Sequence, residues 1–127
     1  MKMQKNVLNA HWVENKMREI IWAKHGENAF DDILKYIIEK PGPINAHKVY
    51  DEIIGKIELL KSERVTTRKS PELSEIGIND IFEINVKPWK IYYKILNDNK
   101  LVSIQYILDT RRNIEEVLLN LVIENKL

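Results

Sequence analysis

The apolar residues in the first part of the chain form one compact run and then follow helical spacing. Residues 18–24 hold the compact run, which predicts a strand. Between Ala29 and Ile38 the apolar positions repeat every three or four residues, which predicts an amphipathic helix with Asn28 as its N-cap. The triplet Pro41-Gly42-Pro43 ends this helix, because proline lacks an amide donor and restricts the residue before it.

A second helical stripe runs from Ala46 to Leu60, and Asn45 is placed to cap it. Two amphipathic helices joined by a short turn of proline and glycine form an antiparallel hairpin. Both apolar stripes need a surface to cover. We therefore expect the hairpin to pack on one face of a sheet that the rest of the chain supplies.

Three strands are predicted after a polar connector at residues 61–77. Apolar and polar residues alternate at 82–86 and again at 89–95. Residues 101–108 are apolar and β-branched on both faces, which is typical of a central strand. Residues 97–100, Asn-Asp-Asn-Lys, predict the turn of a β-hairpin.

A last helix is predicted after Asn113, which is placed to cap it, and its first turn is acidic. The element order predicts an α+β fold: a four-stranded, largely antiparallel sheet with an N-terminal helical hairpin packed on one face and a C-terminal helix. We expect residues 18–127 to form a single domain. We expect residues 1–17 to form an arm, in which the spacing of Leu8 and Trp12 allows a short helix.

Composition excludes several classes of chemistry. The 127 residues carry a net charge of +1 and no cysteine, which excludes disulfides, a thiol nucleophile, a cysteine-ligated zinc site and an iron–sulfur cluster. His11, His25 and His47 share no ligand spacing and the glycines are isolated, so we expect no metal and no cofactor. The longest apolar stretch, at 117–123, is too short for a bilayer, and we expect a soluble cytoplasmic protein without a membrane partner.

Residues 61–112 are locally basic, with ten cations against seven anions. Strand alternation places Lys90, Tyr92 and Lys94 on one face of the sheet. The pair Arg111-Arg112 follows the neighbouring strand, so we expect these cations to converge on a common surface. Such a surface can bind RNA phosphates or an acidic peptide. A solvated sheet face with ordinary charges is the alternative interpretation.

Six short segments match a known family in their order and spacing. They are Ile20–Ala23, Ala29–Ile33, Ser70–Leu73, Phe82–Ile84, Trp89–Tyr93 and Leu108–Arg112. Together they resemble the RelE/ParE superfamily of toxins from type II toxin–antitoxin modules, over residues 19–120. The family's fold agrees with the element order predicted above.

Resemblance to one branch of the superfamily, the RelE-like toxins, implies that the chain is a metal-independent, ribosome-dependent mRNA endoribonuclease. Such an enzyme needs a base, a cation beside the phosphate and an acid for the leaving oxygen. The resemblance places Lys90 and Arg111 at the phosphate, and Tyr93 completes the candidate catalytic set. Tyr92 and Lys94 are further candidates for these catalytic roles.

The chain departs from that branch at three positions. Glu83 and Asn85 stand where RelE-like nucleases carry a lysine pair, and Val117 stands at about the position of their tyrosine. A carboxylate there repels a polyanionic substrate, and valine can neither donate nor accept a proton. The nuclease chemistry is therefore disabled or rebuilt in this chain.

The ParE-like branch resembles the chain better, with Pro71-Glu72-Leu73, Glu83 and Arg111-Arg112. It implies a toxin that arrests growth by acting on DNA gyrase and is neutralised by a cognate antitoxin, as a homodimer or as a heterotetramer with the antitoxin. The residues predicted to meet target, antitoxin or phosphate are Lys90, Lys94, Tyr92, Arg111 and Arg112.

A third hypothesis is a non-toxic scaffold that binds a partner protein. The apolar stripe of the last helix is formed by Val117, Leu118, Leu121 and Val122. It is a candidate docking site for an antitoxin helix. The alternative is that these residues belong to the core.

Overall fold

The computed structural model describes residues 17–127, and the predicted arm at residues 1–17 lies outside them except for Met17. The helices are α2 (Lys24–Glu39), α3 (Pro43–Glu58), the 3-10 helix η1 (Leu59–Lys61), α4 (Pro71–Glu75) and α5 (Ile114–Ile123). The strands are β1 (Glu19–Trp22), β2 (Phe82–Val86), β3 (Trp89–Leu96) and β4 (Leu101–Asp109). None of the helices within residues 17–127 has both the length and the apolarity to cross a membrane.

The four strands form one sheet in the order β1-β4-β3-β2. β2, β3 and β4 are antiparallel neighbours, whereas β1 runs parallel to β4. The predicted α+β class and largely antiparallel sheet are therefore confirmed, with one parallel pair at the β1 edge. The turn at 97–100 is confirmed too: Asn97, Asp98 and Asn99 have φ values of 52°, 54° and 71°, a region that Asn and Asp tolerate better than most residues.

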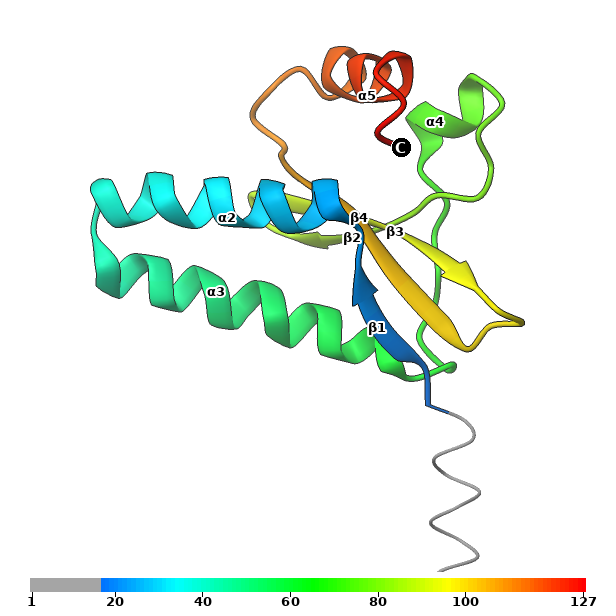
Figure 1. The fold of residues 1–127 in the computed structure, drawn as a ribbon, viewed down its shortest axis with the longest axis horizontal. Coiled ribbons are helices and arrows are strands. Elements are labelled where there is room, and N and C mark those ends of the chain that lie inside the picture. Colours follow the sequence, from blue (N-terminus) through cyan, green and yellow to red (C-terminus); the bar gives the residue numbers. More distant parts are fainter. Residues whose placement is uncertain (1–16) are drawn as a thin grey trace, which may run out of the picture.

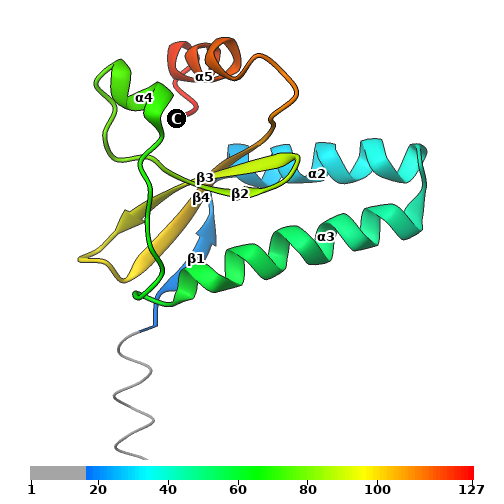
Figure 2. The same ribbon diagram turned by 180° about the vertical axis from the view of Figure 1, so that it is seen from behind.

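Helices lie over both faces of the sheet (Figures 1 and 2), and each face has its own apolar core. The α2–α3 hairpin covers one face, where Phe30, Ile53 and Ile91 belong to the larger cluster. Helices α4 and α5 cover the other face, where Leu73 and Leu118 belong to the second cluster. The hairpin was predicted, but the second covered face was not.

Both hairpin helices begin before the caps that the sequence predicts. The amide of Ala23 donates to the carbonyl of Ile104, 2.9 Å away, and the chain turns directly from β1 into α2 at Lys24. Asn28 therefore lies inside α2, and its prediction as the N-cap is wrong. Pairing of the chain with β4, rather than a side-chain cap, sets this helix start.

Helix α3 begins at Pro43, whose fixed φ suits the first helical position. Its N-cap is Gly42, with φ at 139°, a value that glycine adopts without strain. Asn45 lies in the first turn, so its prediction as the cap is also wrong. By contrast, Asn113 caps α5 as predicted, since its side chain accepts a hydrogen bond from the amide of Glu116 at 3.1 Å.

The polar connector at residues 61–77 contains a short helix and a strand bridge that its sequence does not predict. Ser70 caps the short helix α4 by accepting a hydrogen bond from the amide of Leu73 at 3.3 Å. Just before it, Lys69 forms an isolated antiparallel bridge with Phe82 of β2. The connector thus lies along the outer edge of the sheet.

Arg18 is buried at the start of β1 and joins three parts of the chain. Its guanidinium donates to the carbonyls of Leu60 and Ser62, both at 3.3 Å. It also donates to the backbone carbonyl and the side-chain oxygen of Asn99, at 3.2 and 2.6 Å. This one side chain therefore ties β1 to the end of the helical hairpin and to the β3–β4 turn.

Gly26 and Gly55 offer a matched test of the contact between α2 and β4. A Cβ on Gly26 would lie 2.5 Å from the carbonyl oxygen of Ile104, whereas a Cβ on Gly55 of α3 would meet nothing within 4 Å. We expect Gly26→Ala to lower the free energy of unfolding by about 1–3 kcal/mol because backbone must move. Gly55→Ala should raise it by about 0.5–1 kcal/mol.

Urea unfolding followed by circular dichroism measures both changes. Equal effects of the two substitutions would show that α2 does not approach β4 as closely as described.

Candidate functional site

Strand β3 is covered on both faces, and this changes the predicted cationic surface. Tyr92 is fully buried in the cluster under α4 and α5, and Tyr93 is fully buried in the hairpin cluster. Successive residues of a strand point to opposite faces, and both faces of the sheet are covered, so both side chains point into a core. The expectation that Tyr92 lies on a solvated face between Lys90 and Lys94 is therefore wrong.

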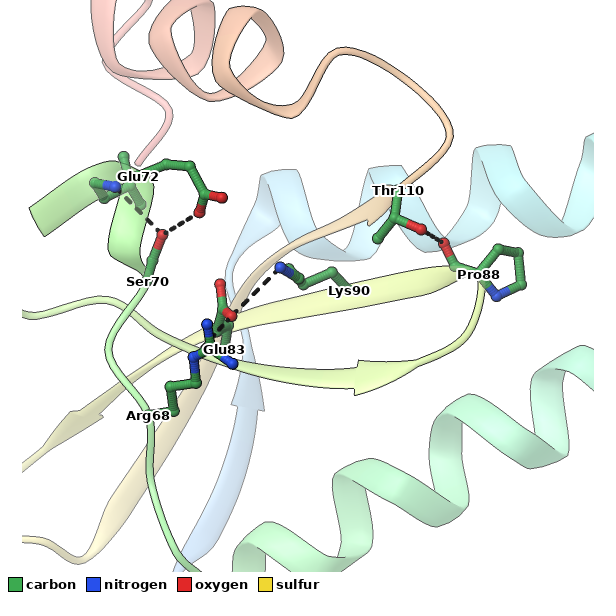
Figure 3. Close-up of polar contacts among 8 residues, drawn as sticks. Arg68, Ser70, Glu72, Glu83, Pro88, Lys90 and Thr110 are labelled. Carbon is green, nitrogen blue, oxygen red and sulfur yellow. Dashed lines mark hydrogen bonds and ion pairs between the residues drawn. The ribbon is translucent and has the colours of Figure 1, made fainter. Parts of the chain in front are cut away.

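Lys90 forms an ion pair beneath the α4–α5 side of the sheet (Figure 3). Its Nζ lies 3.3 Å from the carboxylate of Glu83, and the two side chains are 13% and 1% exposed. Arg68, from the connector, approaches the same carboxylate oxygen at 3.4 Å, with its own side chain mostly exposed. Glu83 therefore neutralises the charge of Lys90 inside the fold.

The Tyr92 hydroxyl lies in this buried polar region without a hydrogen-bond partner among the described residues. Burial raises the pKa of Tyr92 well above its ordinary value, and the carboxylates of Glu83 and Glu72 raise it further. The hydroxyl thus stays protonated at neutral pH. It is poorly suited to serve as a base, because its ionised form is disfavoured by both effects.

Arg111 is held by the residue that ends β4. Its guanidinium donates to both carboxylate oxygens of Asp109, at 2.9 and 2.7 Å, and its amide donates to the first of them at 2.9 Å. These hydrogen bonds hold the pKa of Asp109 below its usual range. Thr110 fixes the same loop, since its hydroxyl donates to the carbonyl of Pro88 at 2.8 Å (Figure 3).

The structure separates the cations that the sequence places together. Lys90 lies on the α4–α5 face, whereas Arg111 borders a cavity on the hairpin face, beside Tyr36 and Trp89. Lys94 is 28% exposed and lies 3.8 Å from Asp80. The prediction of one convergent cationic surface is therefore wrong, although Arg111 and Arg112 do lie together.

The cavity beside Arg111 and Arg112 has a volume of about 600 Å³. Residues from α2 and the following turn contribute to it, and the sequence analysis did not include them among the site residues. They are Asp32, Ile33, Tyr36, Ile37, Lys40 and Pro41. One signal was available: Tyr36 is a large aromatic residue that lies outside the apolar stripe of α2, and the residue is 73% exposed.

The predicted docking stripe of α5 is divided between core and surface. Leu118 and Leu121 are buried in the second cluster, and Val117 and Val122 pack against its margin. Leu119 and Ile123 are instead exposed.

The ion pair between Glu83 and Lys90 should be needed for stability. We expect Lys90→Met to lower the free energy of unfolding by about 3 kcal/mol, because it leaves a buried carboxylate with only one cation. Adding Glu83→Gln should recover at least half of this loss. The control Lys94→Met, which removes a more exposed pair, should cost less than about 1 kcal/mol.

Chemical denaturation of the three variants measures these changes. If Lys90→Met and Lys94→Met cost the same, the Glu83 carboxylate is not buried against Lys90.

The Asp109 carboxyl should titrate differently without its arginine. We expect Arg111→Gln to raise the pKa of Asp109 toward its ordinary value near 4, since the hydrogen bonds to Arg111 are the largest cause of its lowering. A lowered carboxyl pKa stabilises the fold above the ordinary value, and this contribution is lost as pH falls through the lowered one. The Arg111→Gln variant should therefore lose less stability on acidification.

A carbon-13 NMR titration of the carboxyl reports the pKa directly. Arg112→Gln is the control, because Arg112 acts on Asp109 only through its charge and is the smallest cause. Equal shifts in the two variants would contradict the role of the hydrogen bonds.

Comparison with known proteins agrees with the arrangement of the elements. Residues 20–114 match the family model described as ParE toxin of type II toxin–antitoxin system, parDE. A solved structure of the chromosomal ParDE toxin–antitoxin system from P. aeruginosa is similar, with a TM-score of 0.61 and 16% identity over 74% of this chain and 97% of that one. None of the curated proteins compared with the sequence matches it.

Two further solved structures align with lower TM-scores. One is the RelBE2 toxin–antitoxin complex from Mycobacterium tuberculosis, with a TM-score of 0.47 and 10% identity over 73% of this chain and 91% of that one. The other is the isolated E. coli RelE toxin, with a TM-score of 0.45 and 12% identity over 83% and 98%. The family model spans most of the chain, including all of the sheet except the first residue of β1. The chain therefore belongs to the family of ParE toxins of type II toxin–antitoxin systems.

Proposed function

We propose that this chain is the toxin of a two-protein module that arrests growth by a ParE-like action on DNA gyrase in the cytoplasm. The observation that carries the proposal, beside membership of the ParE family, is the burial of Lys90 against Glu83. This ion pair stands where the resemblance places the phosphate-binding cation of a RelE-like nuclease. The family membership favours an antitoxin as the second protein of the module.

Within residues 17–127, the candidate groups of the nuclease alternative are either ion-paired, as Lys90 and Arg111 are, or buried, as the tyrosine hydroxyls are. A metal-independent nuclease needs a cation at the scissile phosphate and accessible groups that move protons. Lys90 is ion-paired, and the hydroxyls of Tyr92 and Tyr93 are buried. An mRNA phosphate would have to compete with the carboxylate of Glu83, which repels it. These features argue against RNA cleavage by this face.

A gyrase poison acts through contact between proteins and needs no catalytic group of its own. The described surface offers polar and apolar side chains for such a contact. Arg111 and Arg112 are exposed at one end of the sheet, and Leu119 and Ile123 are exposed on α5. We assign Arg111 and Arg112 an electrostatic role toward acidic groups of the target or the antitoxin.

A plasmid-cleavage assay with purified protein and gyrase tests the target. We expect gyrase-linked broken plasmid to accumulate in the presence of the chain and ATP. The second arm incubates the chain with mRNA, with and without ribosomes. Cleavage of mRNA only with ribosomes would replace the proposal with the RelE-like activity, and neither effect, together with normal growth on induction, would favour the non-toxic scaffold.

The arginine pair has its own test in the same assay. We expect Arg111→Ala with Arg112→Ala to lower the yield of broken plasmid at least fivefold without unfolding the protein, because two exposed charges are removed. Lys48→Ala with Arg64→Ala removes two exposed cations elsewhere and should leave the yield unchanged. Equal losses in the two double variants would show a dependence on net charge alone.

A further inference from the structure

The cavity beside Arg112 combines an apolar lining with a cationic rim. Ile33, Ile37 and Trp89 are packed in the hairpin cluster and form its floor, and the exposed ring of Tyr36 stands at the side. At about 600 Å³ the cavity can hold one or two large side chains of another protein. Its location, between α2 and the end of β4, leaves it open to solvent along Tyr36 and Lys40.

Two of the three cations in the lining form no ion pair within residues 17–127, although the charge of Arg112 acts on Asp109. Arg111 is held by Asp109, whereas neither Lys40 nor Arg112 forms an ion pair there. Both residues are exposed. A partner that brings carboxylates to this rim would therefore gain two charge-assisted contacts without breaking an existing pair.

The same lining disfavours a nucleic acid. Asp32 lines the cavity and forms no ion pair within residues 17–127, and a continuous phosphate backbone would pass close to it. An acidic peptide can instead place individual carboxylates beside Lys40 and Arg112 and an apolar side chain on the floor. Arg111 and Asp109 already show how a carboxylate is held in this loop, through two parallel hydrogen bonds.

We propose that this cavity binds an acidic segment of a protein partner, with one large apolar side chain seated against Trp89 and Tyr36. Carboxylates on either side of that anchor pair with Lys40 and Arg112. The proposed function makes the antitoxin the source of the segment, and to this extent the inference rests on it. Apolar burial supplies affinity at the centre, and the charged rim selects acidic sequences.

Three synthetic hexapeptides test the proposal on the full-length, nitrogen-15-labelled protein. The first, EELFEE, carries the anchor between carboxylates, and QQLFQQ and KKLFKK replace only the flanking charges. We expect EELFEE to shift the NMR signals of the Trp89 indole N–H and the Arg112 side chain in a saturable way. QQLFQQ should bind at least fivefold more weakly, and KKLFKK should not bind.

Variants locate the binding. Lys40→Gln with Arg112→Gln should weaken EELFEE at least fivefold and abolish its advantage over QQLFQQ. The control double variant Lys48→Gln with Arg64→Gln removes two exposed cations outside the cavity and should bind as the unaltered protein does. Both doubles replace surface residues, and retained NMR dispersion confirms that each is folded.

Several results would overturn the inference. The first is that EELFEE causes no saturable shift of the NMR signals. The second is that the three peptides bind with equal affinity, and the third is that the two double variants weaken EELFEE binding equally. Shifts of the same signals by a duplex DNA oligonucleotide at lower concentration than by EELFEE would assign the cavity to nucleic acid instead. Failure of the gyrase assay with normal EELFEE binding would reject only the proposed target, whereas gyrase cleavage without EELFEE binding would reject only this inference.

Discussion

The burial of β3 on both faces is the constraint on which the rest of this structure depends. Its tyrosines enter separate cores, one beneath the helical hairpin and one beneath α4 and α5. Lys90 lies on the same strand, and a charged amine there is tolerated only because Glu83 of the neighbouring strand lies 3.3 Å away. Lys90, which the resemblance places at the phosphate of a nuclease, is thus part of the buried interior of this protein.

This constraint also explains how the cations are distributed. Lys90 lies on a covered strand and forms a buried ion pair, whereas Arg111 and Arg112 lie beyond the end of a strand and remain at the surface. Arg111 and Arg112 follow β4 directly, where the backbone leaves the sheet and turns toward α5. The exposed arginines therefore lie at the end of the sheet, where residues of α2 join them around one cavity.

The sequence predicted the sheet and the hairpin well, because both depend on periodicity that is local to each segment. The three antiparallel strands, the turn at 97–100 and the cap Asn113 are found where the pattern placed them. The starts of α2 and α3 were missed because pairing with β4 and the geometry of Gly42 and Pro43 override the asparagine caps.

The candidate site was harder to predict, since it depends on contacts between distant segments. Alternation along β3 placed Lys90 and Tyr92 on a common face, but nothing in that strand shows that α4 and α5 cover it. The cavity joins Tyr36 and Lys40 to Arg112, more than 70 positions later in the chain. Such a grouping follows from the fold and has no local signature in the sequence.

The pairing of Lys69 with Phe82 has a consequence for self-association. The amide of Glu83 donates to the carbonyl of Arg68 at 2.8 Å, and the amide of Ser70 donates to the carbonyl of Ile81 at 2.9 Å, so the connector occupies the outer rim of β2. At the opposite edge of the sheet, Met17 bridges Ser62 and the amide of Arg18 donates to the carbonyl of Lys61 at 2.7 Å, so the chain entering β1 is paired as well. Addition of a strand from a second copy to the β2 rim is therefore blocked by the protein's own connector.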